Sequence, residues 1–155
     1  MSWITETFGE RECEMNLPAI KSKARPRFGK GQAYKVPADK VSERTIRDFY
    51  VAACGDSYKG WTDEVHLRVD YQRPYPESGA KYMEGDADLC KPDIDNVLKL
   101  VMDALNGVAW KDDCQVTDVR IRKHRRFRRR QSYLRIKVTY VSNTAVKDPR
   151  ERKGN

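Results

Sequence analysis

Alternating apolar and polar positions predict four strands in this chain. The clearest is 65–72, where apolar side chains at every second position point one way and polar ones the other. Residues 132–141 alternate in the same manner. Segments 10–17 and 115–123 carry weaker versions of the pattern, which suits half-buried strands.

Two segments have helical spacing instead. The first begins at Pro37 and Asp39 and extends to about residue 54; its predicted core stripe is Val41, Ile46, Phe49, Tyr50 and Ala53. The second is capped by Asp93 and ends at Asn106-Gly107; its predicted core face is Leu98, Val101, Met102 and Leu105. The order strand–helix–strand–helix–strand–strand predicts a single two-layer α+β domain with a mixed β-sheet and two main helices.

The remaining segments are polar or interrupted by proline and glycine. Residues 21–36 predict a mobile loop or an irregular hairpin, and 73–90 a long polar loop. We expect the basic stretch between the last two strands to be their hairpin connection. A flexible lead-in over 1–9 and a polar, disordered tail over 142–155 leave 10–141 as the folded domain.

Charge narrows the class of partner. The chain carries 31 Lys and Arg against 23 Asp and Glu, a net charge of +8, which favours a polyanion. Nucleic acid is the expected partner and a membrane is not, because no apolar run approaches the roughly 20 residues of a membrane span. The start of the chain has no signal-peptide character, and the four separated cysteines form no Cys-x-x-Cys pair. We therefore expect a cytoplasmic protein, nucleoid-associated or phage-encoded, with reduced cysteines.

The positive charge is concentrated in two runs that predict contacts with DNA phosphates. Phe28, within the first run, could stack on bases or simply anchor its loop. The second run could equally be a solvated hairpin. The predicted DNA-binding residues are Lys21, Lys23, Arg25, Arg27, Phe28, Lys30, Lys123, Arg125, Arg126, Arg128, Arg129 and Arg130.

An acidic pair opens the second helix. Asp93 and Asp95 follow Pro92, where the backbone is still extended, so both carboxylates can converge beside the first turn. Hydrolysis of a phosphodiester requires an activated water and neutralised phosphate charge, and a carboxylate-held Mg²⁺ provides both. Lys99, one turn past Asp95, could stabilise the phosphate. Alternatively, Asp93 is only an N-cap, and Asp95, Lys99 and Asp103 form a surface ladder of ion pairs.

A second acidic cluster, Asp112-Asp113, follows the end of this helix. One of its carboxylates completes a metal site only if the chain returns to the start of the helix, which sequence spacing does not establish. The alternative is an ordinary Asp-Asp turn.

These segments, in this order, resemble the RusA family of Holliday junction resolvases. Residues 91–108 read Lys-Pro-Asp-Ile-Asp-Asn-Val-Leu-Lys-Leu-Val-Met-Asp-Ala-Leu-Asn-Gly-Val, followed by Trp110, Asp112-Asp113 and Gln115-Val116. Upstream, Lys23-Ala-Arg-Pro-Arg-Phe-Gly resembles the family's basic N-terminal segment. The resemblance covers roughly residues 15–140.

The resemblance implies a RusA-like fold and a homodimeric enzyme that cuts four-way DNA junctions symmetrically, with Mg²⁺ in each subunit and Mn²⁺ able to substitute. Transferred onto this sequence, the family's metal-binding and catalytic aspartates are Asp93, Asp95 and Asp113, and its catalytic lysine is Lys99. Two other functions remain open: a non-catalytic module that binds branched DNA, and a nuclease for flaps or duplex DNA.

Overall fold

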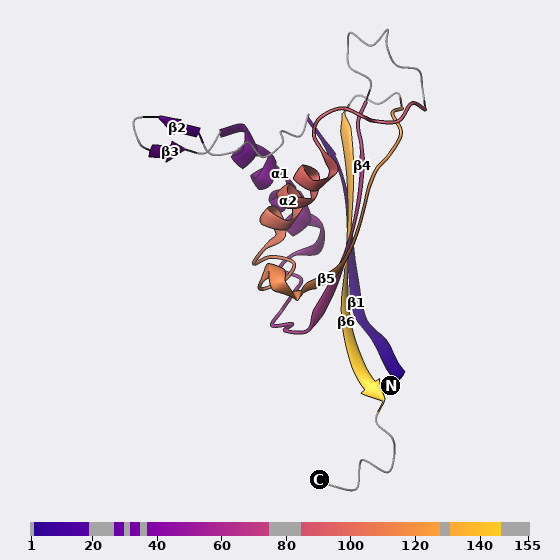
Figure 1. Cartoon of the computed structure of the whole chain (residues 1–155). Helices are drawn as coiled ribbons and strands as arrows, with labels where there is room; N and C mark the ends of the chain where they lie inside the picture. Colours follow the sequence, from indigo (N-terminus) through magenta and orange to yellow (C-terminus); the bar gives the residue numbers. More distant parts are fainter. Residues whose placement is uncertain are drawn as a thin grey trace, which may run out of the picture.

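A computed structural model describes residues 2–18, 27–29, 32–34, 37–74, 85–127 and 131–146. Its elements, in chain order, are β1 (Ser2–Leu17), β2 (Arg27–Gly29), β3 (Gln32–Tyr34), α1 (Pro37–Cys54), β4 (Glu64–Gln72), α2 (Ile94–Leu105), the 3-10 helix η1 (Asp113–Gln115), β5 (Val116–Lys123) and β6 (Ser132–Val146). Both helices pack on one face of a four-stranded sheet (Figure 1). The predicted two-layer α+β fold with a mixed sheet is confirmed.

The sheet has the strand order β1-β6-β4-β5. Strand β6 is antiparallel to both of its neighbours, whereas β4 and β5 are parallel. The predicted hairpin between β5 and β6 is therefore wrong, because β4 lies between them. Residues 124–127, which follow β5, run beside the end of β4, since His124 N donates to the Tyr71 carbonyl oxygen at 2.7 Å.

Both ends of the predicted domain also need correction. Strand β1 begins at Ser2 rather than at residue 10, and it pairs with β6 from Ser2↔Val146 to Leu17↔Ser132. The predicted flexible lead-in is thus part of a strand, and the last strand extends five residues beyond 141. The long antiparallel pairing supplies backbone hydrogen bonds to a polar segment whose side chains gave little sign of a strand. The tail from 147 onward lies outside the described residues.

The core lies between the sheet and the helices. Its sheet side is the predicted apolar face of β4 and of β6. Helix α1 contributes Ile46 and Tyr50, but Val41 and Phe49 are exposed, so only part of its predicted stripe is core. The buried residues of α2 are Val97, Leu100, Val101, Ala104 and Leu105, with Leu98 and Met102 half-buried beside them.

The basic segment over 21–36 contains a short hairpin formed by β2 and β3, as the second of the two predictions for it stated. No helix within the described ranges is both long and apolar enough to cross a membrane.

Candidate active site

The first acidic pair lies where α2 begins. Asp93 is the N-cap residue, and its backbone carbonyl accepts a hydrogen bond from Val97 N at 3.1 Å. Its carboxylate forms no capping hydrogen bond; Lys91 Nζ lies 2.7 Å from Asp93 Oδ2 instead. Asp95 lies in the first turn and is exposed. The role of a simple cap therefore does not account for the Asp93 carboxylate, and both acids are open to solvent.

Lys99 lies one turn beyond Asp95 along α2 and is exposed. Within the described part of the chain, Lys99 forms no ion pair with Asp95, which the alternative interpretation of a surface ladder requires. The Lys99 ammonium group is available at the acidic end of α2.

A buried carboxylate, Asp88, lies just before this helix and collects three cations. We call Asp88, Arg73, Lys123 and Arg126 the Asp88 cluster. Asp88 Oδ1 lies 2.6 Å from Arg73 Nη2, 3.3 Å from Arg126 Nη2 and 3.9 Å from Lys123 Nζ, and the Asp88 side chain is 1% exposed. Burial by itself raises the pKa of the Asp88 carboxyl, but the hydrogen bonds and charge of Arg73, the Cys90 N–H and the charge of Lys123 together hold the pKa below its ordinary value.

The Asp88 cluster fixes the chain that leads into α2. Lys123 Nζ donates to the Cys90 carbonyl oxygen at 2.7 Å, and Arg73 Nη1 donates to that of Lys91. Cys90 N in turn donates to Asp88 Oδ1 at 3.3 Å. These bonds link the ends of β4 and β5 to the residues immediately before the acidic pair. Hydrogen bonds from the Asp88 cluster therefore hold the backbone immediately before Asp93 in place.

Two predicted DNA contacts need correction, because they belong to this cluster. The Arg126 side chain is 3% exposed, and the Lys123 side chain is 12% exposed. Neither can reach a DNA backbone without leaving the buried Asp88 carboxylate. Arg125, which lies between His124 and Arg126, is exposed and donates to the Gly85 carbonyl oxygen at 3.1 Å. Of these three predicted contacts, Arg125 alone is accessible to DNA.

The other predicted DNA contacts fall where the structure describes little. Arg27 and Phe28 lie in β2, but only their backbone placement is described. Lys21, Lys23, Arg25, Lys30, Arg128, Arg129 and Arg130 lie outside the described residues.

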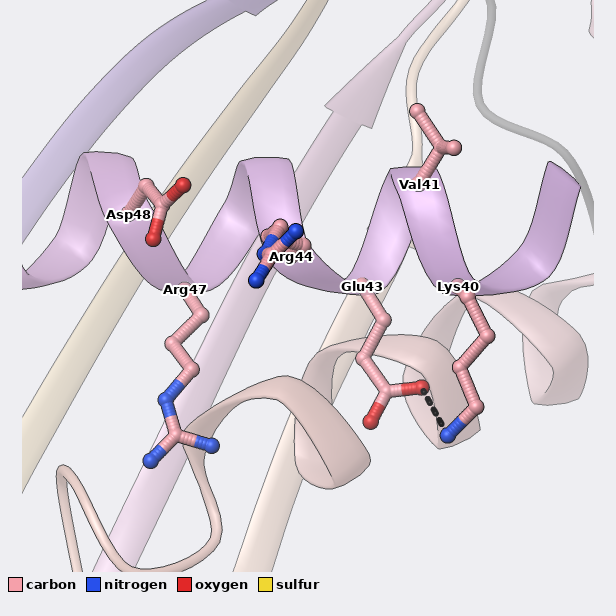
Figure 2. A pocket seen from close by; sticks show the side chains of 6 residues that line it. All are labelled: Lys40, Val41, Glu43, Arg44, Arg47 and Asp48. Atoms are coloured by element: carbon pink, nitrogen blue, oxygen red, sulfur yellow. Dashed lines mark ion pairs between the residues drawn. The ribbon is translucent and has the colours of Figure 1, made fainter. Parts of the chain in front are cut away.

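Helix α1 carries an additional group of charged residues. They border a depression of about 550 Å³ lined by Lys40, Val41, Glu43, Arg44, Arg47 and Asp48. In Figure 2 the side chains of Lys40, Glu43 and Arg47 project on one side of this helix. Lys40 Nζ lies 3.9 Å from Glu43 Oε2. Arg44 and Arg47 have no ion-pair partner among the described residues, so they are free to contact phosphate.

The two residues of the second acidic cluster lie at the start of η1 and have different roles. The Asp112 carboxylate accepts a hydrogen bond from Cys114 N at 3.1 Å, and the Gln115 side chain accepts one from Asp112 N, which together form a capping box. Asp112 is thus the turn residue that the alternative interpretation described. Asp113 Oδ1 accepts from the indole of the buried Trp110 at 2.8 Å and is partly exposed.

Asp113 and the acidic pair lie at opposite ends of the subunit. The Gln115 amide donates to the carbonyl oxygens of Trp61 and Asp63, which places η1 beside the start of β4. The Asp88 cluster places Asp93 beside the end of β4 instead. Since α2 has 12 residues, its two ends are roughly 18 Å apart. In Figure 1 the chain enters β5 below α2, away from the first turn of that helix.

Within one chain, the turn after α2 therefore does not return to the mouth of that helix, which was the condition for Asp113 to join the acidic pair. The turn after α2 leads into the start of β5. Because β5 is parallel to β4, the start of β5 lies beside the start of β4, whereas the mouth of α2 lies beside the end of β4. Across the described ranges, no three acidic, histidine or cysteine side chains gather closely enough to hold a metal ion. Asp93 and Asp95 share the first turn of α2, whereas Asp113 lies beyond the other end of that helix.

Asp88 and Arg73 of the Asp88 cluster were not among the predicted site residues. Asp88 lies in a segment rich in proline and glycine, and its partners are 15 to 38 residues away. The available signal was an acidic residue shortly before the predicted catalytic helix, in a chain of net charge +8. That signal suggests that Asp88 balances positive charge, but it does not identify the residues that Asp88 contacts.

A net charge of +8 suits a polyanionic partner such as nucleic acid. A family model described as "Endodeoxyribonuclease RusA" matches residues 18–139, which is most of the chain, so this chain belongs to the RusA family. The chain is also similar to the uncharacterized protein YqaN of Bacillus subtilis (strain 168), with 39% identity over 70 residues that cover 40% of this chain and 49% of YqaN. The match thus spans about half of that relative's length. Family membership confirms the resemblance found in the sequence.

Proposed function

We propose that this protein is a Mg²⁺-dependent endonuclease that cuts four-way DNA junctions as a homodimer. The observation that carries this proposal is the pair of solvent-open carboxylates, Asp93 and Asp95, at a helix mouth that the Asp88 cluster supports. A pair kept for stability alone would be expected to form caps or buried ion pairs within the fold. The Asp93 carboxylate instead contacts one lysine side chain, that of Lys91, which is itself 77% exposed.

The residues at this mouth suit a divalent cation. Mg²⁺ prefers carboxylate oxygens, needs only one or two of them from the protein and retains several water ligands. Asp93 and Asp95 supply such donors in an accessible position, and Lys91 can swing away from Asp93 because its side chain is exposed. When bound, the ion supplies neutralisation of phosphate charge and a more acidic water.

The neighbouring cations have separate roles in this proposal. Lys99, one turn from Asp95, contacts the scissile phosphate and balances the charge that develops there. Arg125, together with Arg44 and Arg47 on α1, holds DNA arms through their phosphates without reading sequence.

The position of Asp113 gives the homodimer a specific role. Asp113 lies at one end of α2 and the acidic pair at the other, so a two-fold arrangement with antiparallel α2 helices would bring Asp113 of the partner subunit towards Asp93 and Asp95. We propose that each active site is completed in this way. A two-fold dimer also suits a four-way junction, whose near-two-fold symmetry presents two equivalent strands.

The test compares a fixed four-way junction with linear duplex and a flap, with and without Mg²⁺. We expect junction cleavage only with the cation, and Asp95→Asn should abolish cleavage while retaining junction binding. Asp118→Asn, which removes an exposed carboxylate on β5, is the matched control and should cleave normally. Binding without cleavage under any divalent cation would support the non-catalytic module, and preferential cleavage of flaps or duplex would support the broader nuclease.

A further inference from the structure

An aromatic pocket lies away from the acidic pair, at the end of the sheet where β4 begins. Its volume is about 330 Å³. It is lined by residues of β1, of the connection between α1 and β4, and of β6, namely Phe8, Gly9, Arg11, Ser57, Tyr58, Lys59, Gly60, Trp61 and Tyr140. We call it the Trp61 pocket.

Three rings form its apolar wall. The Phe8 and Trp61 ring centroids are 5.2 Å apart, and those of Trp61 and Tyr140 are 5.9 Å apart at an interplanar angle of 74°. Trp61 is anchored, since its indole donates to the Glu64 carbonyl oxygen at 3.0 Å, and Tyr140 belongs to the core. Phe8 is different: it is 59% exposed and contributes little to the core.

A β-bulge directs Phe8 to this position. Thr7 pairs with Val141 and Gly9 pairs with Tyr140, so Phe8 is the extra residue in β1. A bulge interrupts the strand ladder and re-aims a side chain, which is a feature found beside functional sites. Here it holds an exposed phenyl ring against Trp61.

A hydrogen-bonded network beneath these rings keeps the pocket rigid. The Ser57 hydroxyl lies 2.7 Å from the hydroxyl of Tyr50 and 2.7 Å from that of Tyr140. The Tyr140 hydroxyl also donates to the Ala109 carbonyl oxygen. The rings are thus positioned by bonds that form without any ligand.

Two cations border the rings. Arg11 and Lys59 are exposed and form no ion pair with the described part of the chain, and the residues that line the pocket include no carboxylate. Lys59 is held in a left-handed conformation (φ 39°), followed by Gly60 at φ 80°. This turn carries the Lys59 side chain at the pocket rim. A ligand that matches the site has a flat ring and a negative charge.

We propose that the Trp61 pocket binds an unpaired nucleobase of the DNA substrate, with Arg11 and Lys59 on its adjacent phosphates. Bases stack on exposed aromatic side chains regardless of their identity. The pocket is also connected to a predicted catalytic residue, because the Gln115 amide in η1 donates to the Trp61 carbonyl oxygen at 2.9 Å. A base held there lies at the same end of the subunit as Asp113.

This inference rests on the proposed function, because it takes branched DNA as the substrate. Its test uses binding without Mg²⁺, so it does not require cleavage. The probe is a four-way junction with 2-aminopurine at each central nucleotide in turn, and the readouts are fluorescence and affinity. We expect the protein to change the fluorescence at one or two of these positions.

The variants separate stacking from a structural role. Phe8→Ala should lose that fluorescence change and bind the junction about 10-fold more weakly, with linear duplex binding unchanged. Phe8→Trp should restore both readouts. Phe49→Ala removes another exposed phenylalanine, on α1, and should bind as the parent protein does.

Two results would overturn the proposal. The first is an unchanged fluorescence and affinity in Phe8→Ala. The second is conversion of the dimer to a monomer by Phe8→Ala, which would assign the pocket to a partner subunit. Junction binding with the expected fluorescence but without cleavage by the parent protein under any cation would contradict the proposed function alone.

Discussion

Arg73 Nη2 lies 2.6 Å from Asp88 Oδ1, in an ion pair whose carboxylate is almost completely buried beside the mouth of α2. The same arginine donates to the Lys91 carbonyl oxygen, two residues before Asp93. One guanidinium group therefore neutralises the buried acid and positions the chain that carries an exposed one. This relationship makes the stability of the domain and the geometry of its acidic pair depend on the same residue.

Replacing Asp88 should destabilise the protein strongly. In Asp88→Asn, Arg73 and Arg126 lose their buried counter-charge, and removing one partner of such a group costs about 3–5 kcal/mol. Urea unfolding measures the change. Asp118→Asn, an exposed carboxylate on β5, should unfold as the parent protein does. Equal midpoints for the parent protein and Asp88→Asn would show that the buried carboxylate does not stabilise the fold.

The stabilisation by Asp88 should also depend on pH in a defined direction. Its pKa is lower in the folded protein than the ordinary value of 3.8, so the folded state favours the ionised form. The contribution is therefore complete above the ordinary pKa and is lost as pH falls through the lower folded value. The difference in unfolding free energy between parent protein and Asp88→Asn should be constant from about pH 5 to pH 7 and shrink below that. A difference that grows on acidification would contradict this assignment.

Two neighbouring arginines should give opposite phenotypes. Arg126→Ala should lower the free energy of unfolding by about 3 kcal/mol, because Arg126 is buried against Asp88. Arg125→Ala should leave unfolding almost unchanged, weaken binding to all DNA sequences similarly and reduce the slope of log affinity against log salt by about 1. Urea unfolding and salt titrations of DNA binding measure the two effects. A stable Arg126→Ala variant with a reduced salt slope would restore Arg126 to the DNA contacts.

Mixing two inactive variants should reveal whether the active site is shared between subunits. Asp95→Asn and Asp113→Asn are each expected to be inactive as homodimers. A mixed dimer has one intact shared site, so an equimolar mixture that exchanges freely should regain about a quarter of the parent protein's nicking sites. Nicking of a labelled junction after subunit exchange measures this. If each site were formed within one chain, every site in the mixture would carry a defect and activity would not return.

Most of the local structure could be predicted, because the signals for it lie close together in the chain. Apolar alternation located β4 and β6, and proline and aspartate located the starts of both helices. The predictions failed where distant segments decide the outcome. The lead-in became a strand because it pairs with the end of β6, and the expected hairpin between β5 and β6 is absent because β4 lies between them.

The candidate site follows the same division. The acidic residues Asp93 and Asp95 can be recognised in the sequence because they lie in one short segment at a helix start, and the family can be recognised because its pattern spans residues 18–139. The position of Asp113 at the other end of α2 and the burial of Arg126 against Asp88 follow from the fold and not from any local pattern. The physical reason is that helix and strand signals act over a few residues, whereas burial and the approach of side chains depend on how the whole sheet is ordered.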